Sequence, residues 1–193
     1  MAISMPVKDM AKEIGRRITT RLGEEMATRI FGDSEPPSKP EKLSLWVKEA
    51  MDRMDVLVDD ETRSSIMREC GANCANINSR VIEAAKKRRA KHKTNEEFIE
   101  AEMAKPQKGT RLERNRDALI LTYTPRGWSR PIRCYCGLMR GLPSDAMGSS
   151  TYCQCGVGFV KMWWEAVLGK PVDVDLLESA ISGSDECRLR ITY

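Results

Sequence analysis

The sequence predicts an α+β protein, with a helical N-terminal half followed by an antiparallel sheet of about four strands that helices cover. Two observations carry this prediction. Apolar residues recur every three or four positions through the first half of the chain, a spacing typical of amphipathic helices. The second half changes to short apolar or alternating runs with one helical segment between them, which predicts a hairpin, a helix and a second hairpin.

The first two helices are separated by a proline-rich break. An apolar stripe predicts a helix from Pro6 to Phe31. The segment from Gly32 to Pro40 reads as a linker, because each proline lacks a backbone donor and restricts the residue before it. A second helix is expected from Glu41 to Val58, with its apolar residues on one side.

The third helix carries two cysteines and leads into a basic run. Asp59 and Asp60 supply an N-cap for it. Cys70 and Cys74 would share one helical face, unless Gly71 and the asparagines after it interrupt the helix. The basic run AAKKRRAKHK follows, and TNEE then predicts the start of a short helix that ends near a proline.

The remaining elements follow from strand and helix signals. Asp117 to Tyr123 is a β-like run, and Ile132 to Gly137 is expected to return as its hairpin partner. A helix is predicted from about Cys155 to Leu168, ended by glycine and proline. Two closing strands are expected at Pro171 to Leu177 and Glu186 to Tyr193. The last strand alternates, with Cys187, Leu189, Ile191 and Tyr193 on its inward face.

The length fits one globular domain with an N-terminal extension. We expect residues 1–40 to form a helical arm and linker, and residues 41–193 a single domain. Within that domain, 41–110 is the helical part and 115–193 the sheet part. The apolar stripe of the arm is suited to packing on the body or on another subunit, so this helix is a candidate contact for a homo-oligomer.

Composition favours a cytoplasmic protein whose cysteines are reduced. Apolar residues make up 41% and charged residues 31% of the chain, and no apolar run has the length of a membrane span. The N-terminus has no secretory pattern, and the seven cysteines are an odd number. The net charge is only +4, and the basic run contains no aromatic residues, so a solvated helix face is a better interpretation of it than nucleic-acid binding.

Six of the seven cysteines form three close pairs, which we interpret as candidate metal ligands. Thiolates on a strand at alternate positions, or at a helix start, can rotate onto one ion, and four of them suit zinc or an iron–sulfur cluster. Buried thiols and a redox pair are the alternatives. The candidate ligands are Cys70, Cys74, Cys134, Cys136, Cys153 and Cys155, whereas Cys187 fits a role in the core.

The C-terminal part also contains three motifs: a Cys-bearing helix start, a G-x-P-V-x-V strand and a closing Gly-acid-x-Cys-x-x-x-Ile strand. The residues concerned are Cys153, Cys155, Gly156, Gly158, Glu165, Gly169, Pro171, Val172, Val174, Gly183, Asp185, Cys187 and Ile191. With these residues the chain, over about 65–193, resembles the vinyl-4-reductase-like domains and the related L-2-amino-thiazoline-4-carboxylic acid hydrolase-like group. The motifs CGANCA and CYCG also look like those of uncharacterised Cys-rich bacterial and archaeal relatives of that group.

This resemblance implies a ligand-binding fold with several unrelated functions, so a small-molecule ligand is expected and the activity is left open. The family name implies a Cys-dependent hydrolase of a small amide or thiazoline-like substrate. A thiolate at the helix start, Cys153 or Cys155, would be its nucleophile. His92, the only histidine, lies in the basic run and fits a solvated surface residue better than a catalytic base, so Glu165 and Asp145 are the substitutes for a base. We therefore predict a small-molecule-binding protein with a metal-thiolate site, with hydrolysis as the alternative.

Overall fold

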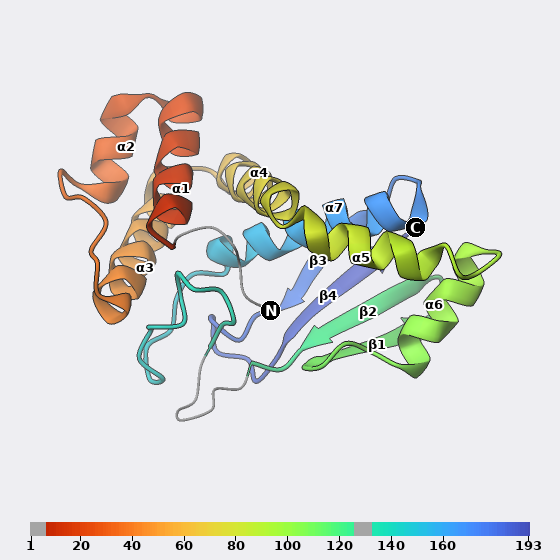
Figure 1. The fold of residues 1–193 in the computed structure, drawn as a ribbon. Helices are drawn as coiled ribbons and strands as arrows, with labels where there is room; N and C mark the ends of the chain where they lie inside the picture. The colour runs from red at the N-terminus through yellow and green to blue at the C-terminus, as the bar shows by residue number, and fades with distance from the viewer. Residues whose placement is uncertain (1–6, 126–132) are drawn as a thin grey trace.

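The computed structural model describes residues 7–125 and 133–193. These residues form seven α-helices and a four-stranded antiparallel sheet with strand order β1-β2-β4-β3. The α+β class, the helical N-terminal half and the order of hairpin, helix and hairpin are therefore confirmed (Figure 1).

The first three helices stand together at one end of the molecule, away from the sheet (Figure 1). They are α1 (Val7–Leu22), α2 (Glu24–Phe31) and α3 (Pro40–Leu57). The single helix predicted through Phe31 is thus two helices, because Gly23 takes a positive φ of 85° that ends one and begins the next. The predicted second helix is confirmed as α3, which begins at Pro40.

The next three helices are α4 (Asp60–Ile77), α5 (Ser79–Arg89) and α6 (Asn95–Ala104). The predicted caps are present, since Asp59 accepts a hydrogen bond from the backbone N–H of Thr62 and Thr94 accepts one from that of Glu97. Helix α4 runs through Gly71 without interruption, so Cys70 and Cys74 lie one turn apart on the same helix.

The sheet contains β1 (Thr110–Asn115), β2 (Ala118–Tyr123), β3 (Asp173–Glu178) and β4 (Cys187–Thr192). The partner of β2 in the first hairpin is β1, which precedes it, so the strand predicted at Ile132 to Gly137 is wrong. Residues 133–137 form bends and turns, and Ile132 lies outside the described residues. The second hairpin is confirmed, and Asp175 of β3 forms an ion pair with Arg190 of β4 at 2.8 Å.

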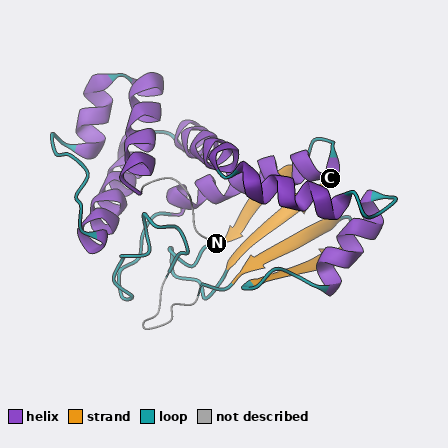
Figure 2. Cartoon of the chain, in the orientation of Figure 1, coloured by secondary structure: helices purple, strands orange, loops and turns teal. Residues whose placement is uncertain are grey.

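Between the hairpins, a 3-10 turn at Ser150–Cys153 leads into α7 (Gln154–Leu168). Gly169 ends this helix in the left-handed conformation, as predicted. Helices α5, α6 and α7 cover one face of the sheet and form a core with it, whereas α1 to α4 form a second core with the loop around Leu138 and Met139 (Figure 2). The two cores meet where α4 packs on α7.

The N-terminal helix does not extend away from the body. Its apolar residues Met10, Ile14 and Ile18 are buried in the core, and α1 packs on α2 and α4. Arg17 of α1 also bridges to Glu69 of α4. The apolar stripe is therefore buried within the chain, and an oligomer through another surface of this helix stays a prediction. In the described ranges, no helix is both long and apolar enough to cross a membrane.

Candidate functional site

All seven cysteines gather in one region, at the junction of the helical half and the sheet. They come from four places along the chain: α4, the turns that follow residue 133, the start of α7, and the first residue of β4. All seven are free thiols. The six predicted ligands belong to this cysteine cluster, which adjoins Tyr152 and the first core. Cys187 faces the helix-covered side of the sheet, as predicted.

A close crossing of α4 and α7 places the helical cysteines next to each other. A Cβ atom added to Gly71 would lie 1.9 Å from the carbonyl oxygen of Cys155, and one added to Gly158 would lie 2.0 Å from that of Arg68. Only glycine permits this approach, because any side chain would occupy the space of the opposite backbone. The two glycines thereby bring Cys70 and Cys74 of α4 to the first turn of α7, where Cys155 lies.

Hydrogen bonds fix the turn that carries Cys134 and Cys136 at several points. Arg133 donates hydrogen bonds to the carbonyl oxygens of Ser144 and Ala180. Tyr135 donates to the carbonyl oxygen of Thr124 at 2.6 Å. Buried Ser44 of α3 donates to that of Leu138 at 2.7 Å. Backbone and side-chain hydrogen bonds therefore hold both thiols against the first core, although no regular strand is present.

Three polar side chains contact sulfur atoms of the cluster, and the sequence reasoning missed all three. The hydroxyl of Tyr152 donates to Sγ of Cys136 at 3.0 Å, and the hydroxyl of Ser179 lies 3.0 Å from Sγ of Cys153. Asn78 donates to Sγ of Cys74 at 3.5 Å. Only Tyr152 directly precedes a cysteine in the sequence, so only for this residue could the sequence have indicated a contact with sulfur.

Burial raises the pKa values of six of the seven cysteines, and repulsion between neighbouring thiols adds to it for several of them. Burial raises the pKa values of Cys70 and Cys153 to about 12 each. Burial, followed by repulsion from a charged Cys136, raises the pKa values of Cys134 and Cys155 well above the ordinary thiol value. The same two causes raise the pKa of Cys74. Cys136 therefore lies within electrostatic reach of thiols from α4, from its own turn and from α7.

The cluster offers soft sulfur donors, but the described residues contain no set of three or more Cys, His, Asp or Glu side chains already arranged around a metal position. A shared ion would require the thiols to rotate toward one point. Such an ion would replace protons on sulfur and remove the mutual repulsion of the thiolates. The chemistry of the donors thus fits a thiophilic metal such as zinc, or an iron–sulfur cluster.

The remaining catalytic candidate lies apart from the cysteines. Glu165 follows Cys155 by ten residues on the same helix, about 15 Å along its axis. It pairs with Lys161 at 3.0 Å. His92 packs on Phe98, with ring centres 6.0 Å apart, beyond the end of α5. Cys153 and Cys155 are thus near each other at the start of α7, and neither Glu165 nor His92 accompanies them.

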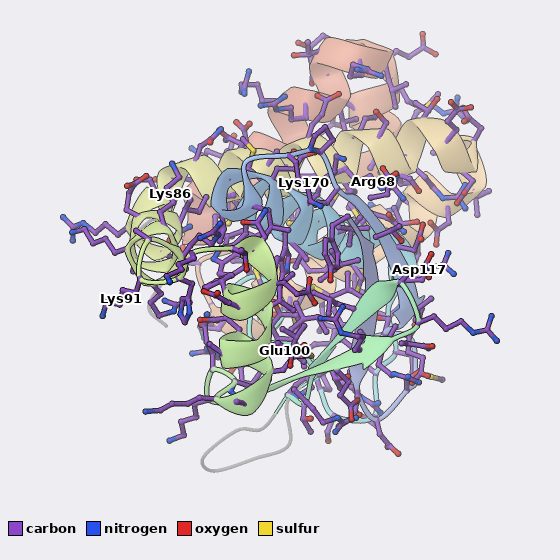
Figure 3. The ribbon with its side chains drawn as sticks, turned by 90° about the vertical axis from the view of Figure 1, so that its right-hand side faces the viewer. Arg68, Lys86, Lys91, Glu100, Asp117 and Lys170 are labelled. Atoms are coloured by element: carbon purple, nitrogen blue, oxygen red, sulfur yellow. The ribbon has the colours of Figure 1, made fainter. Side chains whose placement is uncertain are left out.

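The basic run forms the second half of α5 and the turn after it. Lys86 and Lys91 lie on the side of α5 away from the sheet (Figure 3). Arg88 is paired with Glu102 at 2.8 Å, and Lys86 with Glu83 at 3.0 Å. This surface agrees with the interpretation of a solvated helix face.

The raised thiol pKa values predict that the metal-free protein loses stability in alkaline solution. The unfolded chain releases thiol protons near pH 8.5, whereas folded Cys70 and Cys153 hold theirs to about pH 12, so the unfolding free energy falls as pH rises through this interval. Each thiol contributes a slope of at most about 1.4 kcal/mol per pH unit. Urea unfolding of chelator-treated protein at a series of pH values from 7.5 upward measures this decline in unfolding free energy.

The variant Cys70→Ser isolates one of these contributions, because serine does not titrate in this range. Its unfolding free energy should decline less steeply with pH than that of the unmodified protein. Equal slopes for the two proteins would show that the Cys70 thiol is not held protonated by the fold.

The fold and the site together define a class: an α+β protein with a cluster of reduced, largely buried cysteines where its two cores meet. The chain belongs to the family described as "Family of unknown function (DUF6144)", which matches it over residues 5–193. The resemblance to vinyl-4-reductase-like domains stays a prediction, because no comparison tests it.

Two other comparisons add little. No curated protein matches the chain. One solved structure that resembles it is described as the "crystal structure of the phenol-responsive sensory domain of the transcription activator PoxR with Phenol". It is 18% identical in sequence and covers 97% of this chain and 90% of its own, with a TM-score of 0.41. Similarity at this level carries no inference about function.

Proposed function

We propose that the cysteine cluster is a metal-thiolate centre that binds zinc or an iron–sulfur cluster, in a cytoplasmic protein that binds a small molecule. The observation that supports it most is that six paired cysteines, from segments far apart in sequence, come together as free thiols. Buried thiols packed this closely repel one another when ionised, and a shared cation removes that cost.

Within the cluster we assign Cys74, Cys134, Cys136 and Cys155 as the ligands. A charge on Cys136 raises the pKa of each of the other three and also that of Cys153, so Cys136 is central among these thiols. Cys153 is turned toward Ser179, and the pKa of Cys70 responds, after burial, to the charges of Glu13 and Arg17 rather than to that of Cys136. Four thiolates match the preference of structural zinc and of iron–sulfur clusters.

The alternative, a Cys-dependent hydrolase, has less support. A nucleophilic cysteine requires a lowered pKa, whereas burial raises those of Cys153 and Cys155. The candidate base Glu165 lies about 15 Å from Cys155 along α7 and is paired with Lys161. Hydrolysis would be favoured instead if Cys153→Ser or Cys155→Ser abolished turnover of a substrate without changing metal content.

Metal analysis of protein purified anaerobically without a metal-affinity tag tests the proposal. We expect one zinc ion per chain in a colourless sample, or iron and acid-labile sulfide with visible absorption in a coloured one. Protein that contains neither metal, takes up neither on reconstitution, and exposes seven freely titrating thiols while folded would contradict it.

Tyr152→Phe tests the contact between Tyr152 and the centre. The hydroxyl donates to Sγ of Cys136, and its loss should weaken metal binding by about 10- to 100-fold while the fold is retained. The control is Tyr193→Phe, which removes a hydroxyl that accepts from Arg114 at the far end of the sheet. Competition with a chromophoric chelator measures the metal affinity of both variants. Equal affinities would show that the Tyr152 hydroxyl does not contribute to metal binding.

A further inference from the structure

Two thiols of the cluster, Cys153 and Cys187, contact one short segment between β3 and β4. Sγ of Cys153 lies 3.0 Å from the hydroxyl oxygen of Ser179. Sγ of Cys187 accepts a hydrogen bond from the backbone N–H of Ala180, the next residue, at 3.4 Å. Neither thiol is among the proposed metal ligands. Two adjacent residues therefore hold a pair of sulfur atoms that the metal centre does not use.

The turn that holds both sulfur atoms is itself fixed by hydrogen bonds. The backbone N–H groups of Ser182 and Ser184 donate to the carbonyl oxygen of Ser179 at 3.2 and 3.1 Å. Arg133 donates to the carbonyl oxygen of Ala180 at 3.3 Å. Ser179 and Ala180 are each 3% exposed. The two thiols thus contact a buried, hydrogen-bonded turn, which keeps them in the same place.

Electrostatic effects agree with this proximity. Burial raises the pKa of Cys153 to about 12, and the hydroxyl of Ser179 opposes the rise. The next influence is the charge of Cys187, which comes ahead of that of Cys136. Burial also raises the pKa of Cys187, while the N–H of Ala180 opposes this by stabilising the thiolate. Cys187 has the backbone donor, so it is the thiol suited to attack first.

We propose that Cys153 and Cys187 form a reversible disulfide, with a low-molecular-weight disulfide as the oxidant. The thiolate of Cys187 attacks one sulfur of the oxidant, displaces one thiolate and gives a mixed disulfide. The thiolate of Cys153 then attacks the sulfur of Cys187, forms the protein disulfide and displaces the second thiolate. The two protons lost by the protein pass to the displaced thiolates. The protein is oxidised by two electrons, and the oxidant is reduced to two thiols.

The disulfide would join the start of α7 to the first residue of β4. Both sulfur atoms already contact the same turn, so the two elements need not be brought together from a distance. The pair includes none of the proposed metal ligands, so the disulfide does not depend on the metal centre.

Oxidised glutathione, added in limiting amounts to the reduced full chain under anaerobic conditions, tests the proposal. The first product should lack two hydrogens and carry no glutathione. Trypsin cleaves after Lys161 and Arg188, so mass spectrometry should recover the segment with Cys153 joined to the segment with Cys187. A first disulfide between other cysteines, or none, would overturn the proposal. Metal content, measured on the same samples, decides on the metal centre separately.

Two variants separate the steps of the exchange. Cys153→Ser should stop the reaction at the mixed disulfide and leave glutathione on Cys187, because the second thiol is missing. Cys187→Ser should form a protein disulfide at least about tenfold more slowly, because the first thiol is missing. The control is Cys70→Ser, which removes a buried thiol of α4 outside the pair and should react like the unmodified protein. Unchanged formation of a protein disulfide in Cys153→Ser or Cys187→Ser would overturn the assignment.

Discussion

Gly158→Ala should destabilise the protein by about 3 kcal/mol or more, because the new methyl group has no space. Its carbon would lie 2.0 Å from the carbonyl oxygen of Arg68, which is backbone in the middle of α4 and cannot rotate away. Helices α4 and α7 would have to separate. Since this crossing holds Cys74 near Cys155, the variant should also lose metal affinity.

Gly156→Ala is the matched control on the same helix. Nothing lies within 4 Å of a Cβ atom at that position, so the substitution should be neutral or stabilise the protein by up to about 1 kcal/mol through helix propensity. Urea unfolding followed by circular dichroism compares the two variants. Similar stabilities for Gly156→Ala and Gly158→Ala would mean that the close crossing is absent in solution.

Cys136→Ser should lower metal affinity by more than about 100-fold, exceeding the usual effect of losing a contact outside the ligand set. A charge on Cys136 acts on Cys74, Cys134, Cys153 and Cys155, more of the other thiols than any one other cysteine affects. A serine hydroxyl is a hard, neutral donor and a poor substitute for a thiolate on zinc or iron. The substitution preserves size, so the fold should be retained.

Cys187→Ser is the control for this substitution. Cys187 belongs to the same cluster but is not among the proposed ligands. Its sulfur accepts a hydrogen bond from the backbone N–H of Ala180, which lies between β3 and β4. Competition with a chelator should give an affinity close to that of the unmodified protein. Equal loss in Cys136→Ser and Cys187→Ser would show that the ligand set is assigned wrongly.

The elements with strong local signals could be predicted from the sequence. Helix α7 is bounded by Gly169, which takes the left-handed conformation, and β4 alternates between Cys187 and Ile191 on one face and arginines on the other. Thr94 and Asp59 mark helix starts through side-chain caps. In these places the local sequence and the tertiary packing favour the same structure.

The first hairpin could not be assigned correctly, because its strands carry opposing signals. Strand β1 has the sequence TRLERN, in which Leu112 alone is apolar and buried, so it reads as a polar loop. Residues 134–136 alternate like a strand, yet side-chain hydrogen bonds from Tyr135 and Arg133 hold them in turns. Contacts between residues far apart in sequence determine the conformation of both segments, and local sequence patterns carry no information about such contacts.

The candidate site was predicted by residue type but not by geometry. The spacing of the cysteines indicated three pairs. The crossing of α4 on α7 brings two of them together, and the turns after residue 133 bring Cys134 and Cys136 to the same core. That crossing depends on Gly71, which in sequence suggested an interrupted helix and in the structure allows an uninterrupted one to pack closely. Tyr152 and Ser179 became visible only through their contacts with sulfur.

Cobalt titration of the reduced, metal-free protein tests the central claim most directly. Co²⁺ accepts the same thiolate ligands as zinc and reports them by absorption. We predict an intense sulfur-to-cobalt charge-transfer band, with the ligand-field spectrum of a tetrahedral site, that saturates at one cobalt per chain, is displaced by zinc and is lost in Cys136→Ser. A spectrum without charge-transfer absorption, like that of cobalt bound by water and carboxylates, would contradict the metal-thiolate centre.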